Sequence, residues 1–101
     1  MQTNVSINKD EAVIRLSGRF DFNAHRDFRA SYEPLIDNVA VRSLTFDLGS
    51  VDYLDSSALG MLLMVRDKAT AANKRLALSN AKAGVLQVLN IANFSKLFQI
   101  N

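Results

Sequence analysis

Segments with the two-residue alternation of a β-strand and segments with the spacing of a helix follow one another along this chain. The strand-like segments are residues 4–7, 12–21, 43–48 and 75–79, with a short final strand within 94–100. Helix-like segments at 24–39, 57–73 and 81–93 separate the last four of them. Because strands that alternate with such helices need crossover connections, we expect an α/β fold. The expected architecture is a mostly parallel sheet of four to five strands with helices packed against it.

Single residues indicate where these elements begin, bend or end. Asn23 is expected to cap the first helix, and Pro34 within that helix predicts a kink or break. Asn73 is expected to stop the second helix. Residues 9–11 are predicted to form a turn, and residues 49–55 a connection after the strand that ends at residue 48.

Helical spacing also predicts which side chains face the core. In the first helix they are Phe28, Tyr32, Leu35, Ile36 and Val39. In the second helix they are Ala58, Met61, Leu62, Val65, Ala69 and Ala72. Met64 lies on another face of that second helix, so we expect it to be partly exposed.

Composition excludes several classes of function. The 101 residues predict one domain, spanning 1–101. There is no cysteine and one histidine, so a disulfide framework, a thiol nucleophile and a cysteine or multi-histidine metal site are excluded. The net charge of +2 is scattered without a basic run, which argues against nucleic-acid binding. The N-terminal residues lack the pattern of a signal peptide. The longest apolar stretch, 58–65, is too short to span a membrane, so a cytoplasmic protein is expected.

The segment Asp55-Ser56-Ser57 lies directly before the apolar second helix and has two interpretations. As a cap, Asp55 or Ser56 accepts a hydrogen bond from one of the first helical N–H groups, which lack partners within the helix. As a switch, a phosphorylated serine at this position meets the same N–H groups and the positive end of the helix dipole. Its charge would also repel Asp52 and Asp55 and disrupt an interface that needs them.

Four stretches together resemble a known family. They are "LSGRFD" (16–21), "SLTFDL" (43–48), "VDYLDSSALGMLLMV" (51–65) and "KRLALSNAKAGVLQVLNIANFSKLFQI" (74–100). They are similar to the STAS domain, the module named for sulphate transporters and anti-sigma factor antagonists. The resemblance runs over essentially the whole chain and implies the STAS fold, with the element order expected from the alternation of strands and helices.

The resemblance to stand-alone members implies a bacterial, non-enzymatic switch protein in signal transduction. Such a protein binds a serine kinase of the anti-sigma type while unphosphorylated. Phosphorylation of Ser56 abolishes binding, a PP2C-type serine phosphatase restores it, and the output is transcription, biofilm formation or motility. Ser57 is the backup acceptor, while Asp21 and Asp55 match the acidic residues that support the phosphosite. The chain itself would need no cofactor, metal or small-molecule substrate.

We expect the docking surface for the partner to include Leu54, Ser56, Gly60 and Met64. One alternative is an accessory subunit of a lipid-handling ABC transporter, and a stressosome-like scaffold component is another. His25, Arg26 and Arg29 either flank the serine or form a solvated helix face, which is the more ordinary arrangement. A hydrolytic triad of Ser56, His25 and Asp21 is the least favoured interpretation, because no nucleophile elbow pattern is present.

Overall fold

A single five-stranded sheet in the order β1-β2-β3-β4-β5 organises the computed structural model, which describes residues 1–101. β1 (Gln2–Asn8) forms an antiparallel hairpin with β2 (Glu11–Phe20). β3 (Ser43–Leu54), β4 (Arg75–Ser79) and β5 (Gln99–Ile100) then add in parallel. This confirms the expected α/β fold with a mostly parallel sheet of five strands, in which β1 is the antiparallel member.

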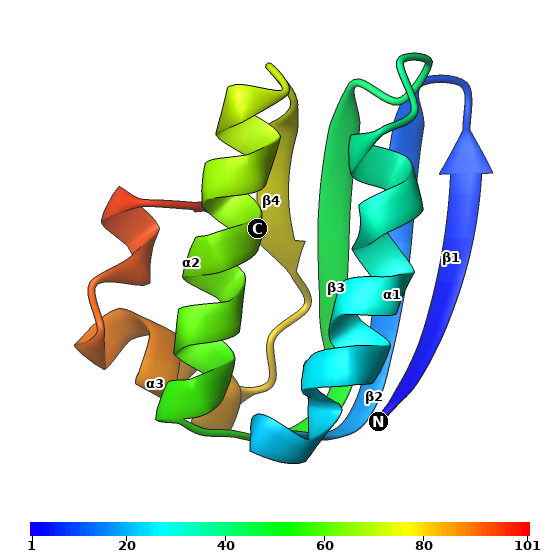
Figure 1. Cartoon of the computed structure of the whole chain (residues 1–101). Helices are drawn as coiled ribbons and strands as arrows, with labels where there is room; N and C mark the ends of the chain where they lie inside the picture. The colour runs from blue at the N-terminus through cyan, green and yellow to red at the C-terminus, as the bar shows by residue number, and fades with distance from the viewer.

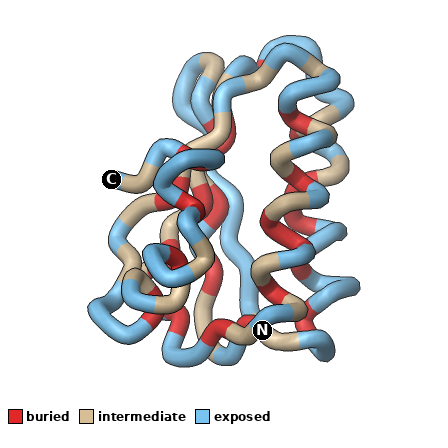
Figure 2. The backbone as a smooth tube through the Cα atoms, turned by 90° about the vertical axis from the view of Figure 1, so that its left-hand side faces the viewer, coloured by how far each residue is buried: buried red, intermediate tan, exposed pale blue.

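The helices cover one face of this sheet. α1 (His25–Ile36) and α2 (Ser56–Ala71) run side by side across it, while α3 (Ala83–Ile91) lies beyond α2 on the β4 side (Figure 1). Two 3₁₀ turns, η1 (Phe22–Ala24) and η2 (Phe94–Lys96), complete the chain. Buried residues lie along the sides of the helices that face the sheet (Figure 2). No helix combines the length and the apolar character needed to cross a bilayer.

The core forms between these two layers from alternating strand residues and helix stripes. Ile14 and Leu16 of β2 are fully buried, and so are the alternating Leu44, Phe46 and Leu48 of β3. The ring of Phe28, from α1, lies 5.0 Å from that of Phe46 and 4.8 Å from that of Phe20. Tyr32 is buried next to Phe28, and this burial raises the pKa of its hydroxyl.

The predicted limits of α1 were wrong at both ends. Asn23 does not cap α1. It lies inside η1, whose cap is Asp21, and the residue at the cap position of α1 is Ala24, which offers no capping side chain. The helix runs through Pro34 without a break and ends at Ile36. Val39, predicted to face the core, is 94% exposed because it lies in the loop after the helix.

The predicted connection at residues 49–55 was also wrong, because β3 continues to Leu54. The extension pairs with the second half of β2, where Arg19 lies opposite Tyr53. The predictions for α2 held: Met61 is buried, Met64 is 49% exposed, and Asn73 has the positive φ of a residue that ends a helix. Ala72 is the exception, since it is only half-buried.

Candidate functional site

The carboxyl ends of β2 and β3 bring two aspartates to the same edge of the sheet. Phe20 and Leu54 are the last paired residues of these strands, and the Asp55 N–H donates to the Phe20 carbonyl at 3.3 Å. Asp21 and Asp55 therefore follow neighbouring strand ends. Each begins a helical segment, Asp21 that of η1 and Asp55 that of α2. Functional side chains in parallel sheets commonly gather at this edge.

Both aspartates act as helix caps. The Asp55 Oδ1 atom accepts from the Ala58 N–H at 3.1 Å, and the Asp21 Oδ1 atom accepts from the Asn23 N–H at 3.0 Å. Each bond satisfies an N–H that has no partner within its own helix. Of the two candidates for the cap of α2, Asp55 and Ser56, the structure gives the role to Asp55. Asp21 caps η1, the turn that leads into α1.

Ser56 is the first residue of α2 and is exposed, whereas Ser57 is half-buried. The backbone N–H groups of the first helical turn and the positive end of the helix dipole both lie beside Ser56. A negatively charged group on its hydroxyl would therefore find hydrogen-bond donors and a favourable field. Of the two serines, the structure makes Ser56 the more accessible.

Charged groups surround this edge in pairs, with one exception. Lys82, at the start of α3, donates to the Asp52 carboxylate at 2.9 Å. Arg19 lies 3.5 Å from the Asp21 carboxylate, and its guanidinium carbon is 4.1 Å from the centre of the Tyr53 ring. Among the three aspartates, Asp55 forms no ion pair and has only its cap bond.

The structure corrects one member of the predicted docking surface. Leu54 is only 5% exposed, because its side chain points into the core at the end of β3. Ser56 and Gly60 are exposed on α2, and the Met64 side chain is half-exposed one turn beyond Gly60. These three residues share a helix face, so a partner can reach them together, whereas it cannot reach Leu54.

Sequence reasoning missed Phe22, the first residue of η1. It is 73% exposed, although the other five phenylalanines of the chain are buried. It directly follows Asp21 and therefore lies at the same sheet edge as Asp55 and Ser56. A signal was present in the sequence: Phe22 lies outside the helical stripe that begins at Phe28, so the spacing gave it no place in the core.

The charged residues of α1 form a polar outer face. His25, Arg26 and Arg29 are exposed, and Arg29 pairs with Glu33 one turn later. The oxygens of Asp21 are engaged by the Asn23 N–H and by Arg19. The hydrogen bond joins Asp21 to its own segment and the ion pair joins it to β2. Neither contact links Asp21 to His25 and Ser56 in a triad.

Comparison with known proteins gives a match along most of the chain. A family model described as "Mlab, STAS domain" matches residues 3–99. A STAS-domain containing protein of Pseudomonas aeruginosa, PA14_20770, is 45% identical over 96 residues, which is 95% of this chain and 93% of that protein.

Solved structures share the fold at lower identity. The anti-sigma factor antagonist SpoIIAA in its unphosphorylated form is 23% identical, with a TM-score of 0.82 over 99% of this chain and 88% of its own. The phosphorylated form of SpoIIAA, described as a Bacillus cell fate determinant, is 22% identical, with a TM-score of 0.75 over 99% and 91%. The STAS domain of a SulP transporter from Vibrio cholerae is 22% identical, with a TM-score of 0.74 over 94% and 75%.

Proposed function

This chain belongs to the STAS domain family, and from that premise we propose that it is a phosphorylation-controlled switch of the anti-sigma factor antagonist type. The unphosphorylated protein binds a serine kinase that also acts as an anti-sigma factor. This binding frees the protein that the kinase had held, such as a sigma factor. Phosphorylation of Ser56 ends the binding, and a PP2C-type serine phosphatase restores it. The protein is the substrate of this cycle and catalyses no step. The kinase binds the ATP and the divalent metal that phosphorylation needs, and the phosphatase binds its own metal.

The observation that carries this proposal is the position of Ser56. Its side chain is exposed at the first position of α2, directly after the Asp55 cap. A kinase can therefore reach the hydroxyl without unfolding the helix. Ser57 is half-buried in the same turn, which makes it the backup acceptor.

Phosphate at this position would change the surface far more than it changes the fold. It adds about 1.5 to 2 negative charges, which the first N–H groups of α2 can accommodate. The same charge lies beside Asp55, the carboxylate without an ion pair. A partner that packs against Ser56, Gly60 and Met64 would then have to desolvate two adjacent anions, and burying unpaired charge is costly.

The comparisons support this proposal at the level of the fold. SpoIIAA is described both as an anti-sigma factor antagonist and in a phosphorylated form, and its structure superimposes on 99% of this chain. The same fold accommodates both states in that protein. Transfer of the role to this chain rests on Ser56 and its surroundings.

The test is a phosphorylation assay followed by partner capture. The protein is incubated with ATP and a serine kinase of the anti-sigma type from the same genome, and the phosphate is mapped by mass spectrometry. We expect modification at Ser56, its loss in Ser56→Ala and its retention in the matched variant Ser57→Ala. In pull-downs, Ser56→Ala should bind the kinase constitutively, and Ser56→Asp should not bind. Equal binding of the kinase by Ser56→Ala and Ser56→Asp would refute the switch.

A second candidate function is an accessory subunit of a transport assembly, such as a lipid-handling ABC transporter. The observation in its favour is the shared fold of the SulP transporter's STAS domain. In that role the chain would bind an ATPase or membrane subunit whatever the state of Ser56. Co-purification with transporter subunits, undiminished by Ser56→Asp, is the result that would favour it.

A further inference from the structure

β1 is an edge strand without the usual protection against pairing. Its seven residues, Gln2–Asn8, include no charged residue and no proline, and all are exposed. Its pairing with β2 is continuous, without a bulge. In an antiparallel pair, about half of the N–H and C=O groups of a strand point away from its neighbour. Natural edge strands usually block such groups with lysine, proline, bulges or short length.

The opposite edge of the sheet is protected. β5 has only two residues, Gln99 and Ile100, and short length is itself one of the usual protections of an edge strand. Only β1 therefore offers a long row of free backbone groups. An association that uses the β1 edge closes after two copies, because neither copy has a second edge of that length.

The sequence of β1 is complementary to itself in the antiparallel direction. If two copies cross at Val5, then Asn4 faces Ser6 of the second copy and Thr3 faces its Ile7. Polar residues meet polar residues on one face of the sheet, and β-branched residues meet on the other. Val5 is 41% exposed and Ile7 is 52% exposed, so both side chains would gain cross-strand contacts.

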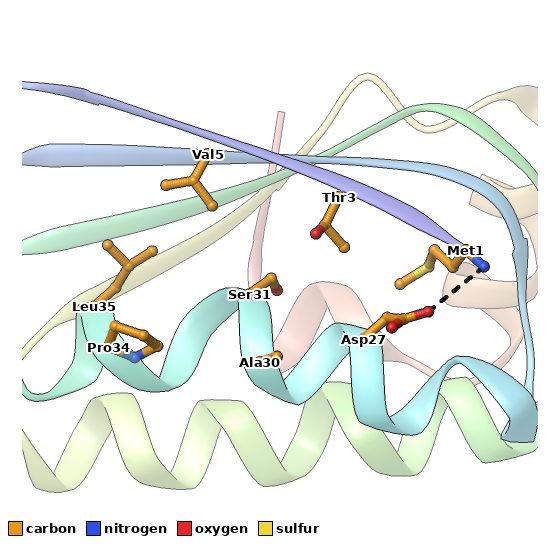
Figure 3. A pocket seen from close by; sticks show the side chains of 8 residues that line it. All are labelled: Met1, Thr3, Val5, Asp27, Ala30, Ser31, Pro34 and Leu35. Atoms are coloured by element: carbon orange, nitrogen blue, oxygen red, sulfur yellow. Dashed lines mark ion pairs between the residues drawn. The ribbon is translucent and has the colours of Figure 1, made fainter.

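The helix-side face of β1 is only partly covered by its own chain. A groove of about 460 Å³ separates β1 from α1 and is lined by Thr3, Val5, Pro34 and Leu35, among others (Figure 3). At one end of the groove, the N-terminal amine lies 3.9 Å from the Asp27 carboxylate. The apolar side chains of β1 thus lack the helix cover that those of β2 and β3 receive.

We propose that the occupant of this edge is a second copy of this chain, paired antiparallel through β1 about a two-fold axis at Val5. The product is a closed dimer with a continuous ten-stranded sheet. A seven-residue strand is about 24 Å long, so the contact is small, and small contacts of this kind are reversible. The Ser56 sites lie at the carboxyl ends of β2 and β3, so the two-fold axis directs them to opposite ends of the dimer, where both remain free for partners.

The first experiment is sedimentation equilibrium of the full chain over a range of concentrations. We expect the mass to rise with concentration from 11.2 kDa towards twice that value. If the protein stays monomeric at every concentration up to about 1 mM, the proposal is overturned, because the free energy of association would then be weaker than about −4 kcal/mol.

The second experiment tests the register with matched charge pairs. In the double variant Asn4→Glu/Ser6→Lys, each carboxylate at position 4 faces an ammonium group at position 6 of the second copy. In Asn4→Glu/Ser6→Glu, carboxylates face each other. Within one chain, position 4 is opposite Arg15 and position 6 is opposite Val13, so both variants should fold.

We expect the Glu/Lys pair to dimerise at least as tightly as the wild type, and the Glu/Glu pair to dimerise at least tenfold more weakly. Circular dichroism and thermal melts confirm that both variants are folded. Equal dimerisation of the two variants would contradict pairing through β1 in this register. Ser56→Asp should leave the dimer unchanged, so failure of the phosphorylation switch and failure of the dimer are separate results.

Discussion

Asp55 and Phe22 lie at the same sheet edge but do different physical work. The Asp55 Oδ1 atom accepts a hydrogen bond from the Ala58 N–H, so the main contribution of this side chain is to the stability of the fold. Phe22 leaves 73% of its side chain in water, so it contributes little to the core. Exposed aromatic rings are typical of residues that contact a protein partner, so Phe22 is a candidate contact of this kind.

Loss of the Asp55 cap should destabilise the protein measurably. Asp55→Ala leaves the Ala58 N–H without its acceptor, which costs about 1 kcal/mol and lowers the Tm by about 4–8 °C. Asp55→Asn retains an acceptor oxygen and should melt close to the wild type. Differential scanning calorimetry of both variants checks this, and an equal loss in both would show that charge, rather than the cap, is the source.

Truncation of Phe22 should weaken partner binding without affecting stability. We expect Phe22→Ala to lower the affinity for the kinase at least tenfold, which corresponds to about 1.4 kcal/mol. The Tm should change little, because the side chain is mostly exposed. Isothermal titration calorimetry with the unphosphorylated protein gives the affinity.

The matched control for Phe22 is Val39→Ala. Val39 is 94% exposed, in the loop that leads to the amino end of β3, at the end of that strand opposite Ser56. Its truncation should change neither affinity nor stability. A similar loss of affinity in both variants would mean that Phe22 has no special role.

At the scale of the elements, the sequence predicted the order of strands and helices but not where each one stops. Ile14, Leu16 and Leu44 alternate plainly, because one face of each strand is buried. The extension of β3 was not predictable from alternation, since Val51 and Leu54 are both buried and break the two-residue period. What holds that extension in the sheet is pairing with β2, a contact between residues 33 or 34 positions apart.

The site was predictable to a similar degree. The capping pattern left Asp55 and Ser56 as candidates for the cap, and the structure gives that role to Asp55. The resemblance to the family indicated Ser56 as the acceptor, which stays a prediction. The exposure of Ser56 and Phe22 and the burial of Leu54 depend on how β2 and β3 end side by side. That arrangement is tertiary, and local sequence patterns do not encode it.

Substitution of Gly60 by alanine should change the stability of α2 and the affinity for the partner in opposite directions. A Cβ atom at Gly60 would meet no other atom within 4 Å, and glycine in a helix costs about 1 kcal/mol relative to alanine. Gly60→Ala should therefore raise the Tm. If the partner packs closely on this face, as we propose, the added methyl group should also lower its affinity several-fold.

Gly84 provides the matched control, since it lies in α3 and a Cβ atom there also meets open space. Gly84→Ala should raise the Tm by no more than Gly60→Ala does and leave the partner's affinity unchanged. Denaturation and titration of both variants measure the two effects independently. Unchanged affinity in Gly60→Ala would remove Gly60 from the docking surface.

At the scale of the whole molecule, the core and the proposed switch are physically separate. The 23 clustered core residues lie between the sheet and the helices, whereas Ser56 is exposed at the first position of α2. Phe20, Leu54 and Ala58 are neighbours of the site in the chain or in the sheet, but their side chains are buried and belong to the core. A charge added at Ser56 therefore changes the surface of the molecule and leaves the packing of the core unchanged.

The phosphorylated protein should consequently be about as stable as the unphosphorylated one. The helix dipole favours the phosphate by about 0.3–1 kcal/mol, and repulsion from Asp55 across solvent opposes it by a similar amount. Phosphorylation lowers the net charge of the protein from +2 to about zero. It leaves the packing of the core unchanged. Urea denaturation of both forms should give free energies of unfolding within about 1 kcal/mol of each other, under conditions where kinase binding is abolished. A loss of several kcal/mol would mean that the phosphate acts by unfolding α2, whereas equal stability with lost binding places its effect at the interface.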